Sequence, residues 1–179
     1  ILKQLSEAYR KIRNTARYIR GNRSDGETTF NPDADSVSDD QLAEIDKWIL
    51  MRLDALTDKV KAGYDAYDFH VVFHAIHNFC VVDLSSFYLD IIKDRLYCEK
   101  VDSVTRRAAQ TTMYRILDTV AKLIAPILSF TAEEIWSFMP HSANDDTESI
   151  FLNEMTAKTG ITCDDAFTAK WDTIYAVRE

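Results

Sequence analysis

Long stretches of this chain lack the residues that interrupt helices. Only four glycines and three prolines occur among 179 residues, whereas an all-β fold needs turn residues at nearly every hairpin. Apolar residues recur instead every three or four positions, the spacing that places them on one side of an α-helix. These features predict an all-α protein, an antiparallel bundle of four to six helices joined by short connections.

Apolar periodicity and capping residues predict where the helices lie. We expect helices over residues 2–20, 38–65, 69–97, 102–126, 131–140 and 165–178. Ser38 with Gln41, and Thr131 with Glu134, have the spacing of a capping box, in which each side chain bonds the other residue's backbone at a helix start. The residues between the first two helices, 22–37, are predicted to form a long polar loop.

The segment 69–97 is apolar on several faces, which predicts a central position in the bundle. Its Asp83-Leu-Ser-Ser stretch forms helix less readily than its flanks, so we expect a break or kink near Asp83. Pro126 and Pro140 should kink or end the helices that they follow. Three histidines and two aspartates interrupt residues 69–92, so this stretch is not typical of a membrane span.

The domain organisation is predicted to change after residue 140. Residues 1–140 should form the bundle, and residues 141–179 a linker and a short helix that lead to a further C-terminal region. The first residue is Ile and the helical pattern begins at once, so we expect a piece of a longer protein. The three cysteines are far apart and lack a CxxC pair, which favours neither a disulfide framework nor a cysteine zinc site. A cytoplasmic location is the expectation.

The net charge of −8 hides a strong asymmetry near the start of the chain. Residues 1–23 hold seven Lys and Arg against one Glu, and residues 24–46 hold eight acidic residues without Lys or Arg. Four arginines of the first helix form one stripe beside its apolar face, namely Arg10, Arg13, Arg17 and Arg20. Two interpretations stay open, because these guanidinium groups could bind RNA phosphates or pair with acidic neighbours. Asn14, on the same helix, could read a base edge or be inert.

Other candidate residues carry weaker signals. His70, His74 and His77 share one helix face, but a metal site would need a further ligand, and the face could simply border the core. Arg106 and Arg107 lie near a helix start, where cations are unfavourable, which favours an external anionic partner. Four aromatic residues could stack on bases or belong to the core: Trp48, Tyr64, Tyr67 and Tyr97. We predict no metal site and no catalytic residue, since phosphate-binding Gly loops, nucleophile elbows and paired acid and base residues are absent from the sequence.

Several strings of this chain occur in the same order in one protein family. They are Ser6–Asn22, Asp46–Leu50, Tyr67–His70, Asp83–Tyr97 and Ile124–Trp136. In this order the chain resembles the anticodon-binding domain of isoleucyl-tRNA synthetases, which belong to class Ia. The string Ile124–Trp136 is shared with valyl and leucyl enzymes, whereas Lys11-Ile-Arg-Asn14 and Phe87–Tyr97 point to the isoleucyl member.

The resemblance implies a class Ia anticodon-binding bundle that receives the anticodon stem-loop of isoleucine tRNA. The parent enzyme would be an isoleucine–tRNA ligase whose ATP and Mg²⁺ sites lie in its catalytic domain, so this fragment should bind tRNA without catalysis or a cofactor of its own. Arg13, Asn14 and Arg17 match positions that contact anticodon bases in related enzymes, and Arg10 and Arg20 extend the stripe toward phosphates. Further partners would be the other domains of the parent, with no membrane and no second copy.

Two alternatives to this interpretation remain at the level of the sequence. One is the corresponding domain of another class Ia enzyme, such as the valyl-tRNA synthetase. The other is a helical adaptor that binds only protein and uses the apolar segment 165–178 as a docking helix.

Overall fold

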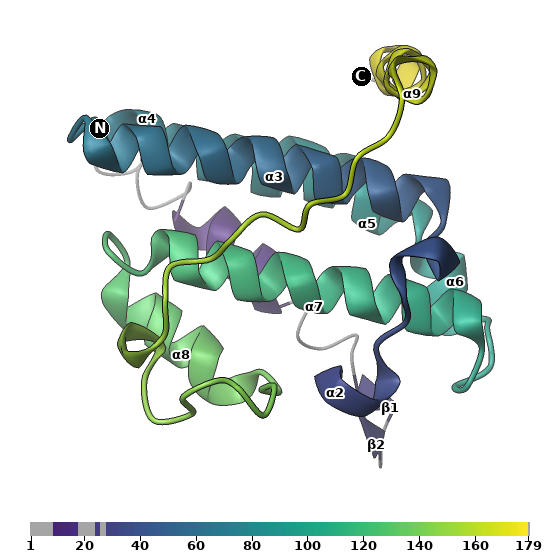
Figure 1. The fold of residues 1–179 in the computed structure, drawn as a ribbon, viewed down its shortest axis with the longest axis horizontal. Coiled ribbons are helices and arrows are strands. Elements are labelled where there is room, and N and C mark those ends of the chain that lie inside the picture. Colours follow the sequence, from purple (N-terminus) through teal and green to yellow (C-terminus); the bar gives the residue numbers. More distant parts are fainter. Residues whose placement is uncertain (1–8, 18–23, 26–27, 179) are drawn as a thin grey trace.

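A computed structural model describes residues 9–17, 24–25 and 28–178, and its architecture is the predicted all-α bundle (Figure 1). Residues 9–17 form a helix, called helix 9–17 below. The helices that follow are α2 (Pro32–Asp35), α3 (Glu44–Asp65), α4 (Phe69–Asn78), a π-helix (Phe79–Tyr88), α5 (Leu89–Ile91), α6 (Lys93–Tyr97), α7 (Val104–Ile124), α8 (Ser129–Phe138) and α9 (Asp165–Arg178). Two 3-10 turns cover Asp39–Gln41 and Ile150–Leu152. The rest of the predicted helix 2–20 lies outside the described residues.

The predicted polar loop 22–37 contains short regular elements where it is described. Strands β1 (Ser24–Asp25) and β2 (Thr28–Thr29) pair antiparallel, with Ser24 opposite Thr29. Helix α2 follows because the Asn31 side chain accepts hydrogen bonds from two backbone N–H groups of its first turn. These elements are too short to change the fold class.

Helix α3 begins six residues later than predicted. The capping box of Ser38 and Gln41 forms, but it opens only a 3-10 turn. The long helix starts at Glu44 because the Asp46 carboxylate accepts a hydrogen bond of 3.1 Å from the backbone N–H of Ala43. The Asp46 carboxylate, and not the capping box of Ser38 and Gln41, therefore marks the start of the long helix.

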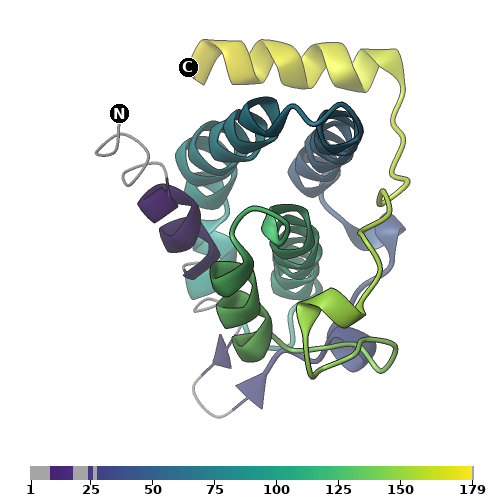
Figure 2. The ribbon, with the colours of Figure 1, turned by 90° about the vertical axis from the view of Figure 1, so that its left-hand side faces the viewer.

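Helix α7 holds the central position that was predicted for residues 69–97. From Arg106 to Ile124 every residue of α7 is buried or half-buried, whereas α4 leaves three polar side chains, those of His70, His74 and Asn78, exposed. Figure 2 shows α7 enclosed by the other helices. The sequence did not predict this burial, because threonines look polar. In the structure, buried threonine hydroxyls of α7 donate to carbonyl oxygens four residues earlier, which lets these side chains lie in the core.

The start of α8 differs from the prediction. This helix begins at Ser129, so Thr131 and Glu134 lie inside it and form no capping box. The Thr131 hydroxyl donates to the Tyr9 hydroxyl at 3.1 Å, and Glu134 accepts from Arg13. Both side chains are therefore used to hold helix 9–17 against α8. The helix ends before Pro140, as predicted.

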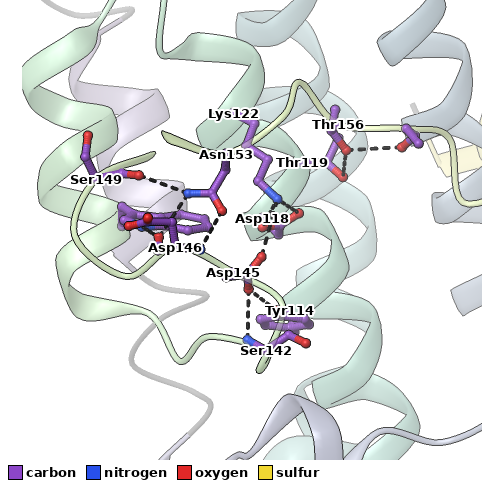
Figure 3. Close-up of polar contacts among 12 residues, drawn as sticks. Tyr114, Asp118, Thr119, Lys122, Ser142, Asp145, Asp146, Ser149, Asn153 and Thr156 are labelled. Atoms are coloured by element: carbon purple, nitrogen blue, oxygen red, sulfur yellow. Dashed lines mark hydrogen bonds and ion pairs between the residues drawn. The ribbon is translucent and has the colours of Figure 1, made fainter. Parts of the chain in front are cut away.

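Residues 141–160 follow the irregular path that was predicted, and polar contacts fix this path against α7 and α8 (Figure 3). The backbone N–H of Asp146 donates to the Asn153 side chain at 2.9 Å, and the indole N–H of Trp136 donates to the carbonyl oxygen of Asp146 at 3.1 Å. This segment packs on the bundle. The domain boundary at residue 140 stays a prediction.

The predicted C-terminal helix is present as α9, which crosses over α3 (Figures 1 and 2). Trp171 is buried against Trp48, with ring centroids 6.0 Å apart, and Tyr175 contacts Phe87 at 5.2 Å. The apolar side of α9 therefore faces inward. Within the described residues, no helix combines the length and the apolar character that crossing a membrane requires.

Candidate nucleic-acid interface

Helix 9–17 presents a polar, mostly cationic surface. Ile12, Thr15 and Ala16 are buried against the bundle, which confirms the predicted apolar face for the described residues and adds Thr15 to it. The outward side chains are exposed, namely those of Arg10, Lys11, Arg13, Asn14 and Arg17. Arg20, the fourth arginine of the predicted stripe, lies outside the described residues. The other three arginines do lie on one exposed surface.

Two polar contacts hold this helix at its seat. The hydroxyls of Thr15 and Ser85 are 3.0 Å apart, which joins the helix to the π-helical segment. On the other side, Thr131 of α8 bonds to Tyr9. Helix 9–17 is therefore fixed between α8 and the π-helix (Figure 2), and its exposed side chains extend from a supported backbone.

Arg13 is held by an ion pair that the sequence did not predict. Its Nη2 lies 2.8 Å from Glu134 Oε1, and its Nε donates to Glu134 Oε2 at 3.4 Å. Hydrogen bonding to this carboxylate raises the pKa of Arg13. Both side chains are nearly half exposed, and exposed pairs of this kind contribute little to stability. A phosphate can therefore replace the carboxylate at little cost.

The acidic segment 24–46 does not neutralise this surface within the part of the chain that the structure describes. Its Asp35 pairs with Arg107 at 3.4 Å and its Asp39 with Arg115 at 2.7 Å, both on α7. The alternative in which the arginine stripe pairs with this segment therefore has no support from these contacts, although Arg13 does pair with Glu134.

A cavity of about 390 Å³ lies along one edge of helix 9–17, between it and the π-helical segment. Lys11 and Asn14 line it from the helix, and Ser86, Asp90 and Lys93 from the facing side. Lys93 pairs with Asp90 at 2.7 Å. The walls thus offer an amide, hydroxyls and opposite charges beside aliphatic surface, a set that can hydrogen-bond the edge of a planar polar ring.

A second cavity of about 230 Å³ lies along the opposite edge, between helix 9–17 and α8. Arg13 and Arg17 line it together with Glu134, Ile135 and Phe138. Phe138 is 60% exposed. Guanidinium planes and an exposed aromatic ring are groups on which unpaired bases stack.

Arg106 and Arg107 are not brought together with helix 9–17. Ile12 of helix 9–17 lies beside Ile124, at the end of α7. Arg106 and Arg107 lie in the first turn of α7, roughly 25 Å from Ile124 at 1.5 Å per residue (Figure 1). Arg106 donates to the carbonyl oxygen of Glu99 at 3.0 Å, and Arg107 binds Asp35 and a glutamine of its own helix. Their contacts within the fold stabilise the start of α7.

The three histidines lie on α4, where His70 and His74 are exposed and His77 is half-buried. Burial lowers the pKa of His77, and the charges of Lys11 and His74 lower it further. Among the described residues, no group of three or more His, Cys, Asp or Glu side chains is placed to hold a metal ion. The histidines instead line a groove between α3 and α4.

The candidate stacking residues divide into buried and exposed ones. Trp48 belongs to the core, and the Tyr64 hydroxyl donates to the carbonyl oxygen of Leu123 at 2.7 Å, where burial raises its pKa to about 12. Tyr67 and Tyr97 are 79% and 62% exposed, Tyr67 on the connection before α4 and Tyr97 as the last residue of α6. The first two are structural.

Sequence reasoning missed several residues that line the interface, above all Lys11, Asp90 and Lys93. Lys11 was available as a signal because it adjoins the arginine stripe on the same helix. Asp90 and Lys93 belong to residues 69–97, which were predicted to form a central helix, and they line the cavity from the segment that follows the π-helix.

Comparisons with known proteins identify relatives of this chain. A family described as the anticodon-binding domain of tRNA ligase matches residues 46–179. The chain is 52% identical to the isoleucine–tRNA ligase of Syntrophotalea carbinolica over 178 residues, which are 99% of this chain and 18% of that protein. It is 51% identical over 180 residues to the isoleucine–tRNA ligase of Caldicellulosiruptor bescii, covering 100% of this chain and 19% of that protein. The chain thus spans about a fifth of the length of these curated relatives.

Proposed function

Because this chain belongs to the family of anticodon-binding domains of tRNA ligases, we propose that helix 9–17 and its two flanking cavities bind the anticodon loop of isoleucine tRNA. The observation that carries this proposal is the set of exposed side chains between the cavities. Arg10, Lys11, Arg13, Asn14 and Arg17 share one short helix in a chain of net charge −8. The identity of 45–52% to isoleucine–tRNA ligases supports isoleucine tRNA over valine tRNA.

The chemistry of an anticodon loop matches these groups. Its bases are single-stranded, so they can turn outward, be read on their edges and stack on planar side chains. Asn14 lines the larger of the two cavities, and its side-chain amide can both donate and accept hydrogen bonds, which suits the edge of a base. Arg13 and Arg17 at the smaller cavity suit stacking and bidentate phosphate contacts. Arg10, on the same exposed surface, would contact the sugar–phosphate backbone of the RNA. Arg20, three residues after Arg17 in the sequence, is proposed for the same role.

Binding here would act on catalysis through orientation. A tRNA held at its anticodon has its distant acceptor end fixed relative to an active site elsewhere in the protein. This favours transfer because the translational and rotational entropy of the acceptor end is lost on binding and not in the reaction step. We expect the ATP and Mg²⁺ sites and all catalytic residues in other domains of a full-length, monomeric, cytoplasmic isoleucine–tRNA ligase. Arg106 and Arg107 remain candidates only for a peripheral contact, since both have partners within the fold.

The packing of α9 argues against the alternative of a protein-binding adaptor. That alternative required the apolar side of residues 165–178 to be available for docking. Trp171 and Tyr175 of α9 pack instead on Trp48 and Phe87 of the bundle.

The test of this proposal removes the two guanidinium groups at the smaller cavity. In the full-length protein, Arg13→Ala combined with Arg17→Ala should weaken binding of isoleucine tRNA about 10- to 100-fold at low salt, since two charged contacts are lost. Filter binding at several salt concentrations measures this effect. Both side chains are exposed, so the melting temperature should stay within a few degrees. Unchanged tRNA affinity and unchanged aminoacylation would contradict the proposal.

A further inference from the structure

A groove between α3 and α4 gathers positive charge on a second face of the molecule. It has a volume of about 610 Å³, and Arg52 and Lys59 of α3 face His70 and His74 of α4 across it. Its one acidic lining residue is Asp83, which is buried and accepts hydrogen bonds from Arg52 and from Tyr175. The charge that the groove offers to a ligand is therefore positive.

Four charged residues in the middle of α3 lie on different sides of the helix. At 100° per residue, Arg52 and Lys59 lie on one side, and Asp54 and Asp58 lie about 100° or more around it. The two acids face the segment that leads to α9, where Asp54 accepts from the backbone N–H of Thr159 at 2.7 Å and Asp58 pairs with Lys158 at 3.0 Å. The carboxylates of Asp54 and Asp58 are thus used within the fold, whereas Lys59 lines the groove.

Helix α4 borders both the groove and helix 9–17. That helix lies alongside α4 and the π-helix (Figure 2), with Ile12 beside Phe73 and Ile76. His77 of α4 is close enough to Lys11 for the lysine charge to lower the pKa of the imidazole. A line of cationic or protonatable groups thus runs from helix 9–17 to α3, which we call the basic track: Lys11, His77, His74, His70 and Lys59.

We propose that the basic track binds phosphodiester groups of RNA, those of the stem next to the anticodon loop. The inference rests on the proposed function, because a tRNA that places its loop at helix 9–17 must direct its stem along a neighbouring face. His70 and His77 are about 10 Å apart along α4 at 1.5 Å per residue, which spans several phosphates of one strand. Duplex stems are bound by shape and phosphate contacts, for which ammonium and imidazole donors are suited.

Two neutral substitutions in the full-length protein test the basic track. Lys59→Gln with His74→Gln removes two donors of the groove and leaves helix 9–17 intact. The matched control is Lys158→Gln, which removes an exposed ammonium group that pairs with Asp58 on the other side of α3. Isoleucine tRNA binding is titrated over a range of salt concentrations, and the phosphates whose ethylation interferes with binding are mapped.

The double variant should bind roughly 5- to 20-fold more weakly at low salt, with a log–log salt dependence shallower by about 1–2. Interference should disappear in the stem and persist in the anticodon loop. Lys158→Gln should match the unmodified protein, and Lys59→Arg, which keeps the charge, should retain binding.

An affinity and a salt dependence equal to those of Lys158→Gln would overturn the basic track, even where Arg13→Ala with Arg17→Ala abolishes loop binding. A loss confined to the groove variant would instead support the track and contradict the assignment of the loop to helix 9–17. A change in melting temperature without any change in tRNA binding would assign Lys59 and His74 a structural role, which also overturns the proposal.

Discussion

Asp46 shows how one side chain determines the local geometry of several elements. It is fully buried at the start of α3, where it caps the helix through Ala43. It also accepts from the Tyr88 hydroxyl at 2.7 Å and from both terminal nitrogens of Arg95 at 2.9 and 2.7 Å. Burial and the Asp46 charge raise the pKa of Tyr88, which keeps the phenol protonated as a donor. Burial disfavours the charged form of Arg95, but its bonds to Asp46 outweigh this effect and raise its pKa.

Removing the Asp46 carboxylate should therefore be costly. Asp46→Ala leaves the Arg95 charge and the Tyr88 hydroxyl without their partner, and breaking a buried pair in this way costs about 3–5 kcal/mol. Urea unfolding measures the loss in the free energy of unfolding. The control Asp58→Ala breaks an exposed pair with Lys158 and should lower the free energy of unfolding far less. Equal losses in the two variants would contradict this account of Asp46.

Residue patterns within one helix were predictable, and contacts between distant residues were not. The periodicity of helix 9–17 identified its buried Ile12 and Ala16 correctly. The Arg13–Glu134 pair joins residues 121 positions apart, so no local spacing indicated it. For the same reason Thr131 and Glu134 matched a capping box by spacing alone, while their real partners lie on helix 9–17.

At the scale of elements, the weak stretch near Asp83 corresponds to the π-helix Phe79–Tyr88. The hydroxyls of Ser85 and Ser86 bond to carbonyl oxygens five residues earlier, at 2.8 and 2.9 Å. The sequence predicted a departure from regular helix there, because these residues form helix poorly. It did not predict the π form, since other elements fix Asp83 through Arg52 and Tyr175.

Helix α9 is held through a few side chains. Among its described residues Trp171 is buried, Tyr175 is half-buried and most of the others are exposed. The Tyr175 hydroxyl donates to Asp83 at 2.9 Å, its ring lies 5.7 Å from the Arg52 guanidinium carbon, and Lys170 pairs with Glu44 at 2.5 Å. An element with so few buried contacts belongs to the low-stability end of the fold.

Loss of one of these contacts should loosen α9 alone. Tyr175→Phe removes a hydrogen bond to a carboxylate, an interaction worth about 1.5–3 kcal/mol. Amide hydrogen exchange should therefore quicken roughly 10- to 100-fold in α9 and stay unchanged in α3. The control Thr173→Ala removes an exposed hydroxyl that bonds only within α9, and should have a much smaller effect. Equal acceleration in α3 would show that α9 does not open separately.

At the scale of the whole molecule, helical periodicity predicted the fold class and most helix positions, because each helix buries one face. It did not predict the path of residues 141–160, which depends on partners far away in the chain. Asp54 binds the backbone of Thr159 and Gly160, and Asp33 binds Ser142, more than a hundred residues later. Polar segments of this kind look like linkers in sequence and become ordered only through the surfaces that they meet.

The distribution of exposed charge also depends on contacts between residues far apart in the chain. The net charge of −8 does not forbid an RNA surface, since many acidic groups are used inside the fold. Asp46 holds Arg95, and Asp83 holds Arg52. The cationic side chains of helix 9–17 that the structure describes are exposed, and Arg13 forms a half-exposed ion pair with Glu134. The candidate site could be predicted from sequence as a basic helix, but its cavities required the structure.

Nuclease protection of isoleucine tRNA by the full-length protein tests the central claim most directly. The account predicts protection of the anticodon loop that is lost when Arg13 and Arg17 are both replaced by Ala, while protection at the acceptor end persists. Protection of the anticodon loop that survives this double substitution unchanged would contradict the assignment of anticodon binding to helix 9–17.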